Sequence, residues 1–157
     1  MNNLQTRYIF ILFLALILQL TIVKYIQIFN WRPDLLLIVI VSYSLKKGPN
    51  VGMTAGFFTG LIQDLLSTHF LGLAALSKTV AGFVAGSLAG KFAARTEFYL
   101  TLLISGLIHD FCYFLIYTLG EEFSFQSLFF LYTIPNVMYT VLLGGFFYYL
   151  IESWINE

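Results

Sequence analysis

Charged residues are scarce in this chain. Only 10% of its 157 residues are Asp, Glu, Lys or Arg, whereas a soluble globular domain carries about 25%. Hydrophobic residues make up 59% of the chain, and its mean hydropathy is +0.86. So few polar groups could not cover the surface of a soluble domain, but a surface that faces lipid needs none. The composition therefore predicts a polytopic, all-α membrane protein in which residues 1–157 form a single transmembrane domain.

Metal-ligating and redox residues are also rare. The one cysteine, Cys112, cannot build a disulfide framework or a cysteine-based metal site. The two histidines, His69 and His109, are too few for a typical His-rich site, and no H-E-x-x-H motif occurs. We therefore expect no metal site and no bound cofactor. The formal net charge is zero and there is no basic block, which argues against a nucleic-acid partner.

No catalytic set can be read from the sequence. There is no G-x-S-x-G nucleophile elbow, and the glycine-aspartate motif of intramembrane aspartic proteases is absent. His109 and Asp110 are neighbours in the chain, so on a helix they point about 100° apart and cannot form a nucleophile–base–orienter line by themselves. We predict that the protein is not an enzyme. An intramembrane enzyme stays as an alternative only because His109, Asp110 and Cys112 lie close together.

Long apolar runs dominate what is present. A helix that spans a bilayer needs about 20 apolar residues. The run from Tyr8 to Val23 follows Arg7 and resembles a signal peptide, but no small-x-small cleavage pattern follows it, so we interpret it as a retained first helix. About six transmembrane helices are predicted, at residues 6–26, 33–45, 50–66, 71–92, 97–119 and 134–151.

The second predicted segment, 33–45, is unusually short. At 1.5 Å per residue it is about 20 Å long, against about 30 Å for the hydrocarbon core. Pro33 suits the first turn of a helix, and Asp34 suits its positive N-terminal end. Lys46 and Lys47 could snorkel to one interface while Trp31 sits at the other. A re-entrant helix is the alternative for this segment.

The last apolar stretch, residues 123–151, contains no charge. One helix of that length would be about 43 Å long, too long for a bilayer without strong tilt. We therefore place Pro135 in the first turn of the final helix and interpret the Phe-rich residues 123–132 as an interfacial segment. Glu121 and Glu122 are expected to form a solvated turn before it.

The distribution of lysine and arginine predicts the orientation. With six helices the two termini share one side of the membrane. That side receives Arg7, Lys46, Lys47, Lys91 and Arg95. The other side receives Lys24 and Arg32, together with the two glutamates. The positive-inside rule therefore predicts that both termini are cytoplasmic.

Glycines at intervals of four mark two neighbouring segments. The first set is Gly52, Gly56 and Gly60, and the second is Gly82, Gly86 and Gly90. This spacing places small residues on one helix face, where they let two backbones approach closely. The two ladders either pack on each other or offer a face to a partner protein's helix.

Ionisable residues inside apolar segments form a candidate site. They are Asp64, Lys78, His109 and Asp110. A charge at the centre of a membrane helix costs about 2.5–3.5 kcal/mol on insertion scales. The turn after residue 66 brings Asp64 and Lys78 to similar depth, so an ion pair between them is expected. The four residues form either a polar pocket for a small ligand or proton, or a buried network that fixes helix register.

One stretch of the sequence resembles a known family. Pro33-Asp34-Leu35-Leu36-Leu37 is followed by Lys47-Gly48-Pro49, then by Gly52-x3-Gly56-Phe57-x2-Gly60-Leu61-x2-Asp64-Leu65-Leu66-Ser67, then by Leu71-Gly72-Leu73-x-Ala75-Leu76 and the second glycine ladder. This order resembles the bacterial rod shape-determining protein MreD family, from about Pro33 to Gly90. Asp64 is carried over as the acidic residue that ends the first glycine motif.

The resemblance implies a non-enzymatic scaffold or adaptor of the cell-elongation (peptidoglycan synthesis) complex in the cytoplasmic membrane. It implies proximity to an MreC-like protein, to MreB-type filaments, and to a RodA-type glycosyltransferase with its class B penicillin-binding partner. It also implies a fold similar to the six-helix substrate-binding subunits of energy-coupling-factor transporters. That similarity supplies the alternative function, a small-molecule-binding transporter subunit. The alternative is weakened because the first helix carries only Ala15 and not an alanine ladder.

Overall fold

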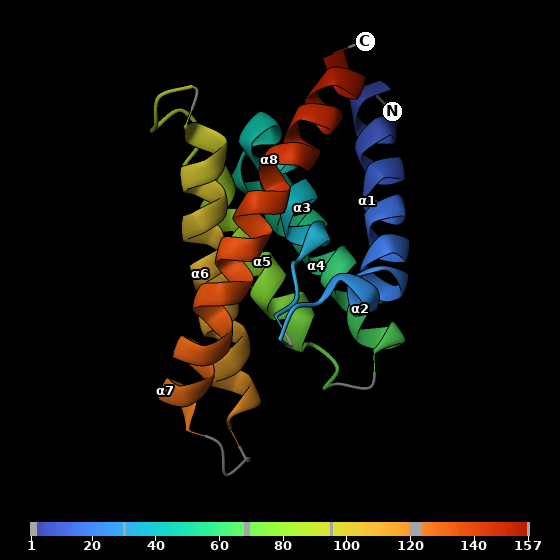
Figure 1. Cartoon of the computed structure of the whole chain (residues 1–157). Helices are drawn as coiled ribbons and strands as arrows, with labels where there is room; N and C mark the ends of the chain where they lie inside the picture. Colours follow the sequence, from blue (N-terminus) through green and yellow to red (C-terminus); the bar gives the residue numbers. More distant parts are fainter. Residues whose placement is uncertain (1–2, 30, 68–69, 95, 120–123, 157) are drawn as a thin grey trace.

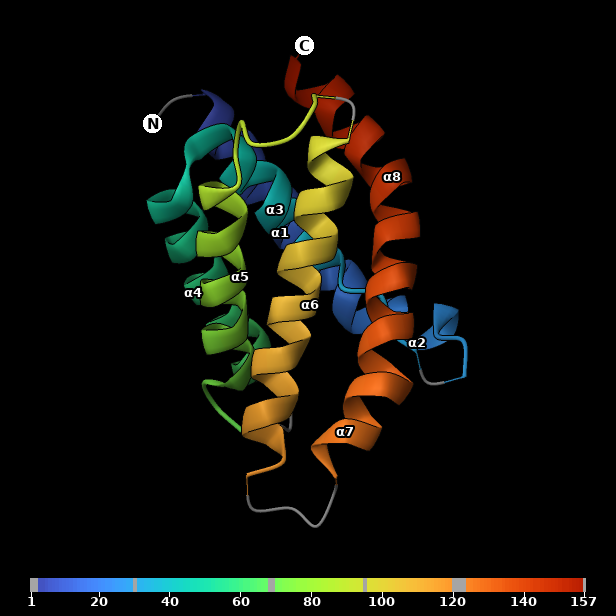
Figure 2. The same cartoon turned by 90° about the vertical axis from the view of Figure 1, so that its left-hand side faces the viewer.

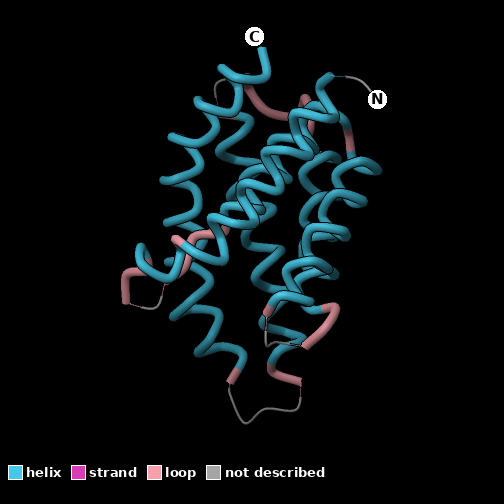
Figure 3. The backbone as a smooth tube through the Cα atoms, turned by 90° about the vertical axis from the view of Figure 1, so that its right-hand side faces the viewer, coloured by secondary structure: helices cyan, strands magenta, loops and turns pink. Residues whose placement is uncertain are grey.

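The computed structural model describes residues 3–29, 31–67, 70–94, 96–119 and 124–156. Within these ranges the chain is helical apart from short connections and one isolated bridge between Ile28 and Trp31. Figure 3 shows this as helical tubes joined by short loops. The helices are α1 (Asn3–Thr21), α2 (Val23–Ile26), α3 (Leu35–Lys47), α4 (Pro49–Leu66), α5 (Leu73–Ser87), α6 (Glu97–Tyr117), α7 (Phe125–Leu128), a π-helical turn η1 (Phe129–Thr133) and α8 (Ile134–Asn156). The predicted all-helical class is confirmed for this part of the chain.

The short helix α3 is the centre of the bundle. It packs against α1, α4, α5, α6 and α8, which surround it in Figures 1 and 2. Every residue from Leu35 to Ser44 is buried, so the helix has no exposed face. A helix that is apolar all round is stable only when other elements cover it on every side. The apolar side chains of α3 are therefore buried against the surrounding helices of the protein.

The start of α3 differs from the prediction. Pro33 lies before the helix and not in its first turn, and Asp34 is the N-cap, whose side chain accepts a hydrogen bond from the Leu37 N–H at 2.9 Å. The extended backbone before α3 is held by a side chain of α1. The Gln19 amide donates to the Pro33 carbonyl at 3.2 Å and accepts from the Leu35 N–H at 2.8 Å. Because a glutamine satisfies these buried backbone groups, the helix can begin inside the bundle.

Helices α4 and α5 form the closest pair in the bundle, and their glycines explain why. A Cβ added to Gly56 would lie 2.2 Å from the Lys78 carbonyl oxygen, and one added to Gly82 would lie 2.2 Å from the Gly52 carbonyl oxygen. Gly60 and Gly86 are equally crowded by backbone atoms of the facing segment. The two glycine ladders therefore face each other. These glycines pack within the protein and do not offer a face to a partner helix.

Gly90 does not belong to this seam. Helix α5 ends at Ser87 and not at residue 92 as predicted, and Gly90 follows it with φ +75° and open space around its Cα. Positive φ is the conformation that glycine adopts without steric strain. The four-residue spacing of Gly90 therefore reflects a turn after the helix and no packing contact.

The C-terminal helix is longer than predicted. Helical structure runs without a loop from α7 through the π turn η1 into α8, so Pro135 lies within a continuous helical rod and the Phe-rich residues before it are helical. A proline inside a helix removes one backbone hydrogen bond, and a π-helical turn is one way in which a helix accommodates such a defect. Phe123, Glu121 and Glu122 lie outside the described residues, as do His69 and Arg95.

Among the described residues, two helical stretches are long and apolar enough to cross a membrane, Glu97–Tyr117 and Gln126–Ile151. The first predicted helix, 6–26, is divided into α1 and the short α2. The described ends of the chain, at the start of α1 and the end of α8, lie at the same end of the bundle (Figures 1 and 2). This placement agrees with an even number of passes along the bundle axis.

Candidate functional site: a buried charge network

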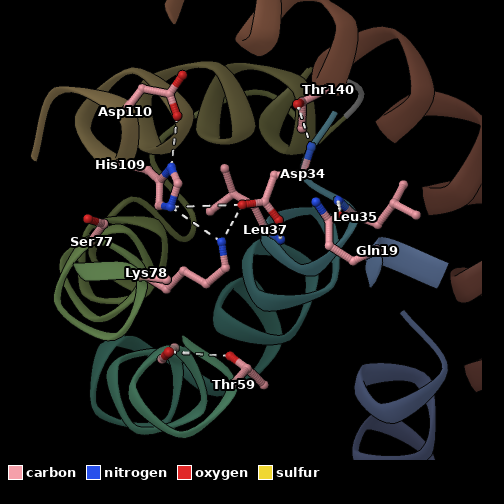
Figure 4. Close-up of polar contacts among 12 residues, drawn as sticks. Gln19, Asp34, Leu35, Leu37, Thr59, Ser77, Lys78, His109, Asp110 and Thr140 are labelled. Carbon is pink, nitrogen blue, oxygen red and sulfur yellow. Dashed lines mark hydrogen bonds and ion pairs between the residues drawn. The ribbon is translucent and has the colours of Figure 1, made fainter. Parts of the chain in front are cut away.

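A network of four ionisable side chains lies in the middle of the bundle. Asp34 comes from the N-cap of α3, Lys78 from α5, and His109 and Asp110 from α6 (Figure 4). The Lys78 side chain is 1% exposed, although lysine is almost never fully buried unless it is paired. Three helices that are distant in the sequence are thereby joined through charged groups.

The contacts form one continuous chain. The Lys78 ammonium donates to Asp34 Oδ2 in an ion pair, and its Nζ lies 3.3 Å from His109 Nε2. On the other side of the ring, His109 Nδ1 lies 2.9 Å from Asp110 Oδ1. His109 Nε2 is 3.8 Å from Asp34 Oδ2, so the imidazole lies between the two carboxylates. The order is Asp34, Lys78, His109, Asp110.

The geometry fixes the tautomer of His109. A neutral imidazole has one N–H donor and one acceptor nitrogen. Asp110 Oδ1 is a carboxylate oxygen and can only accept a hydrogen bond, so His109 Nδ1 carries the hydrogen and donates it. Nε2 then accepts from the Lys78 ammonium. Lys78 and His109 are thus joined by one hydrogen bond between their nitrogens.

The structure corrects the expected pair between Asp64 and Lys78. Lys78 pairs with Asp34, while the Asp64 carboxylate accepts three backbone N–H bonds at 3.0 Å, from Gly72, Ala74 and Ala75. Free N–H groups and a partial positive charge lie at the N-terminus of α5, where a carboxylate is stabilised. Asp64 is therefore separate from the network and acts as a remote cap of α5.

Asp34 is the site residue that sequence reasoning placed only at a helix end. The prediction that it suits the N-terminus of its helix agrees with its capping bond to Leu37. Its second oxygen receives Lys78, and its backbone N–H donates to Thr140 Oγ1 of α8 at 3.0 Å. The available signal was a carboxylate at the start of a short, strongly apolar segment, because such a group inside a bundle needs a cation.

Four polar or weakly polar residues recur at intervals of three to four along α6, namely Thr101, Ser105, His109 and Cys112, and three of them are buried. Thr101 and Ser105 are 0% exposed, His109 is buried, and Cys112 is partly exposed. Within the described residues Thr101 Oγ1 and Ser105 Oγ have no hydrogen-bond partner. A ladder of rings continues from His109 along the same helix. His109 and Tyr113 stack with centroids 6.2 Å apart, and Tyr113 and Tyr117 with centroids 6.3 Å apart.

An apolar groove lies on another side of the bundle. It has a volume of about 400 Å³ and is lined by residues of α1, α3 and α8. The lining includes Leu14 and Leu18 of α1, Ile38 of α3, and Phe147 and Leu150 of α8. Every lining residue is apolar, so the groove is suited to a hydrocarbon surface such as an apolar helix or a lipid chain.

The network joins helices α3, α5 and α6. In the described part of the chain no group of three His, Cys, Asp or Glu side chains is placed to hold a metal ion. Each of the four ionisable residues contacts another member of the network. Breaking such a pair by removal of one partner is costly, so the network opposes separation of α3, α5 and α6.

Comparison with known proteins gives one assignment. No curated protein and no solved structure matches the chain. The family model of the rod shape-determining protein MreD matches residues 2–157, which is essentially the whole chain and extends well beyond the motifs between Pro33 and Gly90. The family is one of membrane proteins that determine rod shape. The chain therefore belongs to the MreD family of rod shape-determining proteins.

Proposed function

We propose that this protein is a non-enzymatic membrane scaffold of the bacterial cell-elongation complex. Membership of the MreD family implies a role in rod shape determination. The proposed partners are an MreC-like protein, MreB-type filaments reached directly or through it, and a RodA-type glycosyltransferase with its class B penicillin-binding protein. The scaffold role is supported by the short connections between the described helices, because a protein built mostly of membrane helices acts mainly through its membrane-facing sides.

We place the protein in the cytoplasmic membrane with six passes, formed by α1, α3, α4, α5, α6 and α8. Both termini are cytoplasmic in this proposal. The start of α1, the end of α3 and the end of α5 lie at this common end (Figures 1 and 2), and these segments contain or adjoin Arg7, Lys46, Lys47 and Lys91, as the positive-inside rule expects. The short α3 needs no contact with lipid, because the other helices cover it. A fold similar to that of energy-coupling-factor substrate-binding subunits stays part of the proposal.

The apolar groove between α1 and α8 is the observation that carries the scaffold proposal. The glycine ladders face each other, so they are not free to receive a partner helix. The groove is a concave apolar face that no described helix of this chain fills. We assign to it the membrane-spanning helix of the MreC-like partner, because a single apolar helix matches its all-apolar lining.

The test is co-purification from native membranes with variants that block the groove. Leu14 and Leu150 line it and are 46% and 47% exposed, so Leu14→Trp and Leu150→Trp should fill it. Phe13→Trp and Leu142→Trp are matched controls, because these residues are 61% and 73% exposed and lie outside the groove. The proposal expects the MreC-like protein to be lost from the first pair only. Unchanged recovery with all four variants would refute the groove assignment.

A second candidate is a small-molecule-binding transporter subunit. The buried network of Asp34, Lys78, His109 and Asp110 favours it, because intramembrane charges often mark substrate sites. However, these groups are paired with one another, which leaves few of their donors and acceptors for a ligand. Thermal stabilisation of the purified protein by a vitamin, or recovery of an ATPase pair with it, would support this function over the scaffold.

A further inference from the structure

The connection between α1 and α3 carries the two most exposed aromatic side chains in the described part of the chain. Tyr25 of α2 is 89% exposed, and Phe29, in the turn after α2, is 85% exposed. Lys24 and Arg32 of the same connection are also exposed. Single exposed apolar residues are common on proteins, but two rings and two cations on one short connection form a patch. We call these four residues the connection patch.

The backbone at Phe29 has an unusual conformation. Among the described residues it is the one non-glycine residue with positive φ, at +49°. Ile28 and Trp31 exchange two backbone hydrogen bonds, with N···O distances of 3.3 and 2.8 Å, and thereby close a tight turn that contains Phe29. For a bulky residue a positive φ is an outlier, and glycine or asparagine would adopt it with less strain. Strain of this kind gathers at functional positions, which indicates a use for the exposed ring.

Side chains of α8 hold the connection in place. The Tyr139 hydroxyl donates to the Ile26 carbonyl at 2.9 Å, and the Arg32 backbone N–H donates to Asn136 Oδ1 at 2.9 Å. The indole of Trp31 also donates to the C-terminal helical rod. These bonds satisfy backbone groups that have no partner in a regular helix. The connection is therefore fixed to the bundle, while its two exposed rings remain uncovered.

The connection leaves the bundle sideways. In Figure 2, α2 stands out beyond α8 at the side of the bundle and not at its end. The sides of a membrane bundle face lipid. Helix α3, which follows the connection, has 13 residues and is about 20 Å long, about 10 Å less than the hydrocarbon core. The connection therefore lies next to the lipid of the leaflet opposite the termini.

The charges of the patch indicate which part of the lipid covers it. Within the described residues neither Lys24 nor Arg32 forms an ion pair. Arg32 Nε donates to the neutral Gln27 side chain at 3.0 Å, which orients the guanidinium without neutralising it. Asp34, the nearest acidic residue in the sequence, is paired with Lys78. Two uncompensated cations at a lipid-facing side need anions, and the phosphates of the headgroups are the anions at that position.

We propose that the connection patch is an interfacial anchor that binds the phosphate groups of anionic phospholipids in the leaflet opposite the termini. Tyr25 and Phe29 lie at the boundary between acyl chains and headgroups, where amphipathic and aromatic rings are favoured. Lys24 and Arg32 extend along the lipid to the phosphates, as long cationic side chains do. Their reach, together with thinning of the leaflet around α2, compensates for the short α3.

The anchor is separate from the apolar groove. None of its four residues lines the groove. The inference therefore does not depend on the partner proposed for the groove, and purified protein without any partner is sufficient to test it.

The first experiment measures depth in vesicles of phosphatidylcholine and phosphatidylglycerol. Tyr25→Trp adds an indole to the patch of the full chain, and Phe13→Trp adds one to an exposed position in the middle of α1. Bromine atoms near the headgroup end of the acyl chains should quench the added emission of Tyr25→Trp most. Bromine atoms near the chain ends should quench that of Phe13→Trp most. No quenching of Tyr25→Trp, or the same depth for both indoles, would overturn the anchor.

The second experiment compares the two lipids, each brominated at the same position near the headgroup. Brominated phosphatidylglycerol should quench the Tyr25→Trp indole more than brominated phosphatidylcholine does, with a local enrichment of about fivefold for each cation. Lys24→Gln combined with Arg32→Gln should abolish this preference. Lys46→Gln combined with Lys47→Gln removes two cations at the other end of α3 and should retain it. Equal quenching by the two lipids, or a preference that survives loss of both patch cations, would contradict phosphate binding.

The third experiment separates the anchor from the stability of the fold. Phe29→Asn removes one ring and relieves the strain, because asparagine adopts positive φ more readily. The midpoint of thermal unfolding in detergent should therefore not fall. In vesicles the Tyr25→Trp indole of the same chain should be quenched less by bromine near the headgroups. A lower midpoint with unchanged quenching would show that Phe29 serves the fold and would count against the anchor.

Discussion

The indole N–H of Trp31 donates a hydrogen bond to the carbonyl oxygen of Leu131, with 3.2 Å between Nε1 and the oxygen. In a regular helix the Leu131 carbonyl would accept from the N–H of the residue four positions later. That residue is Pro135, which has no N–H. The side chain before α3 therefore gives a hydrogen bond to a carbonyl whose α-helical donor position is occupied by proline.

Trp31→Phe should lower the free energy of unfolding by about 1 kcal/mol, the usual net worth of one hydrogen bond. Pro135→Ala restores a backbone donor to the Leu131 carbonyl. The same Trp31→Phe change should then have a much smaller effect in the Pro135→Ala background. Reversible unfolding of the four proteins in a double-mutant cycle measures the difference. Identical effects in both backgrounds would show that the indole contributes only by packing.

The pair formed by Lys78 and Asp34 should behave as a coupled unit. Lys78→Met leaves Asp34 buried without its cation, and Asp34→Asn leaves Lys78 without its carboxylate, so each single change should cost about 3–5 kcal/mol. The double variant should be more stable than the sum of the two losses predicts, because no unmatched charge remains. Unfolding in mixed micelles tests this, with strictly additive losses as the contrary result.

Two glycines of the bundle should differ sharply in their tolerance of alanine. A methyl group on Gly56 meets the Lys78 carbonyl at 2.2 Å, and backbone cannot move there without separating α4 from α5. A methyl group on Gly106 meets the Val137 side chain at 3.2 Å, which a small adjustment relieves. Gly56→Ala should therefore cost about 1–3 kcal/mol or more, as overpacking does, and Gly106→Ala clearly less. Thermal melts in one detergent compare the two variants, and equal losses would argue against a tight α4–α5 seam.

Loss of the Asp64 carboxylate should loosen the start of α5. Asp64→Ala leaves the Gly72, Ala74 and Ala75 N–H groups without their acceptor, and each unsatisfied buried donor costs about 1–3 kcal/mol. Hydrogen exchange should accelerate at residues 72–75, with little change at the far end of α5. Ser67→Ala is a suitable control, because its hydroxyl donates only to the Asp64 carbonyl. Unchanged exchange at 72–75 would contradict the capping role.

The sequence by itself determined that this protein is helical and that its surroundings are lipid. Scarce charge and long apolar runs leave few polar groups to cover a soluble surface, and each run has an end marked by Pro, Gly or charged residues. The spacing of Gly52, Gly56 and Gly60 also predicted a close helix contact, because a period of four maps directly onto one helix face. These are local properties of the chain, so they can be read without knowing which helices are neighbours.

Tertiary structure decided which buried groups are partners. Sequence proximity suggested Asp64 for Lys78, but the carboxylate that reaches Lys78 is Asp34, 44 residues away in the chain. The choice depends on α3 lying at the centre of the bundle between α5 and α6, and hydropathy alone does not specify that arrangement. The continuous helix through Pro135 also depends on a tertiary contact. A proline usually ends a helix, and here Trp31, more than 100 residues earlier, donates to the carbonyl of Leu131, whose α-helical donor position Pro135 occupies.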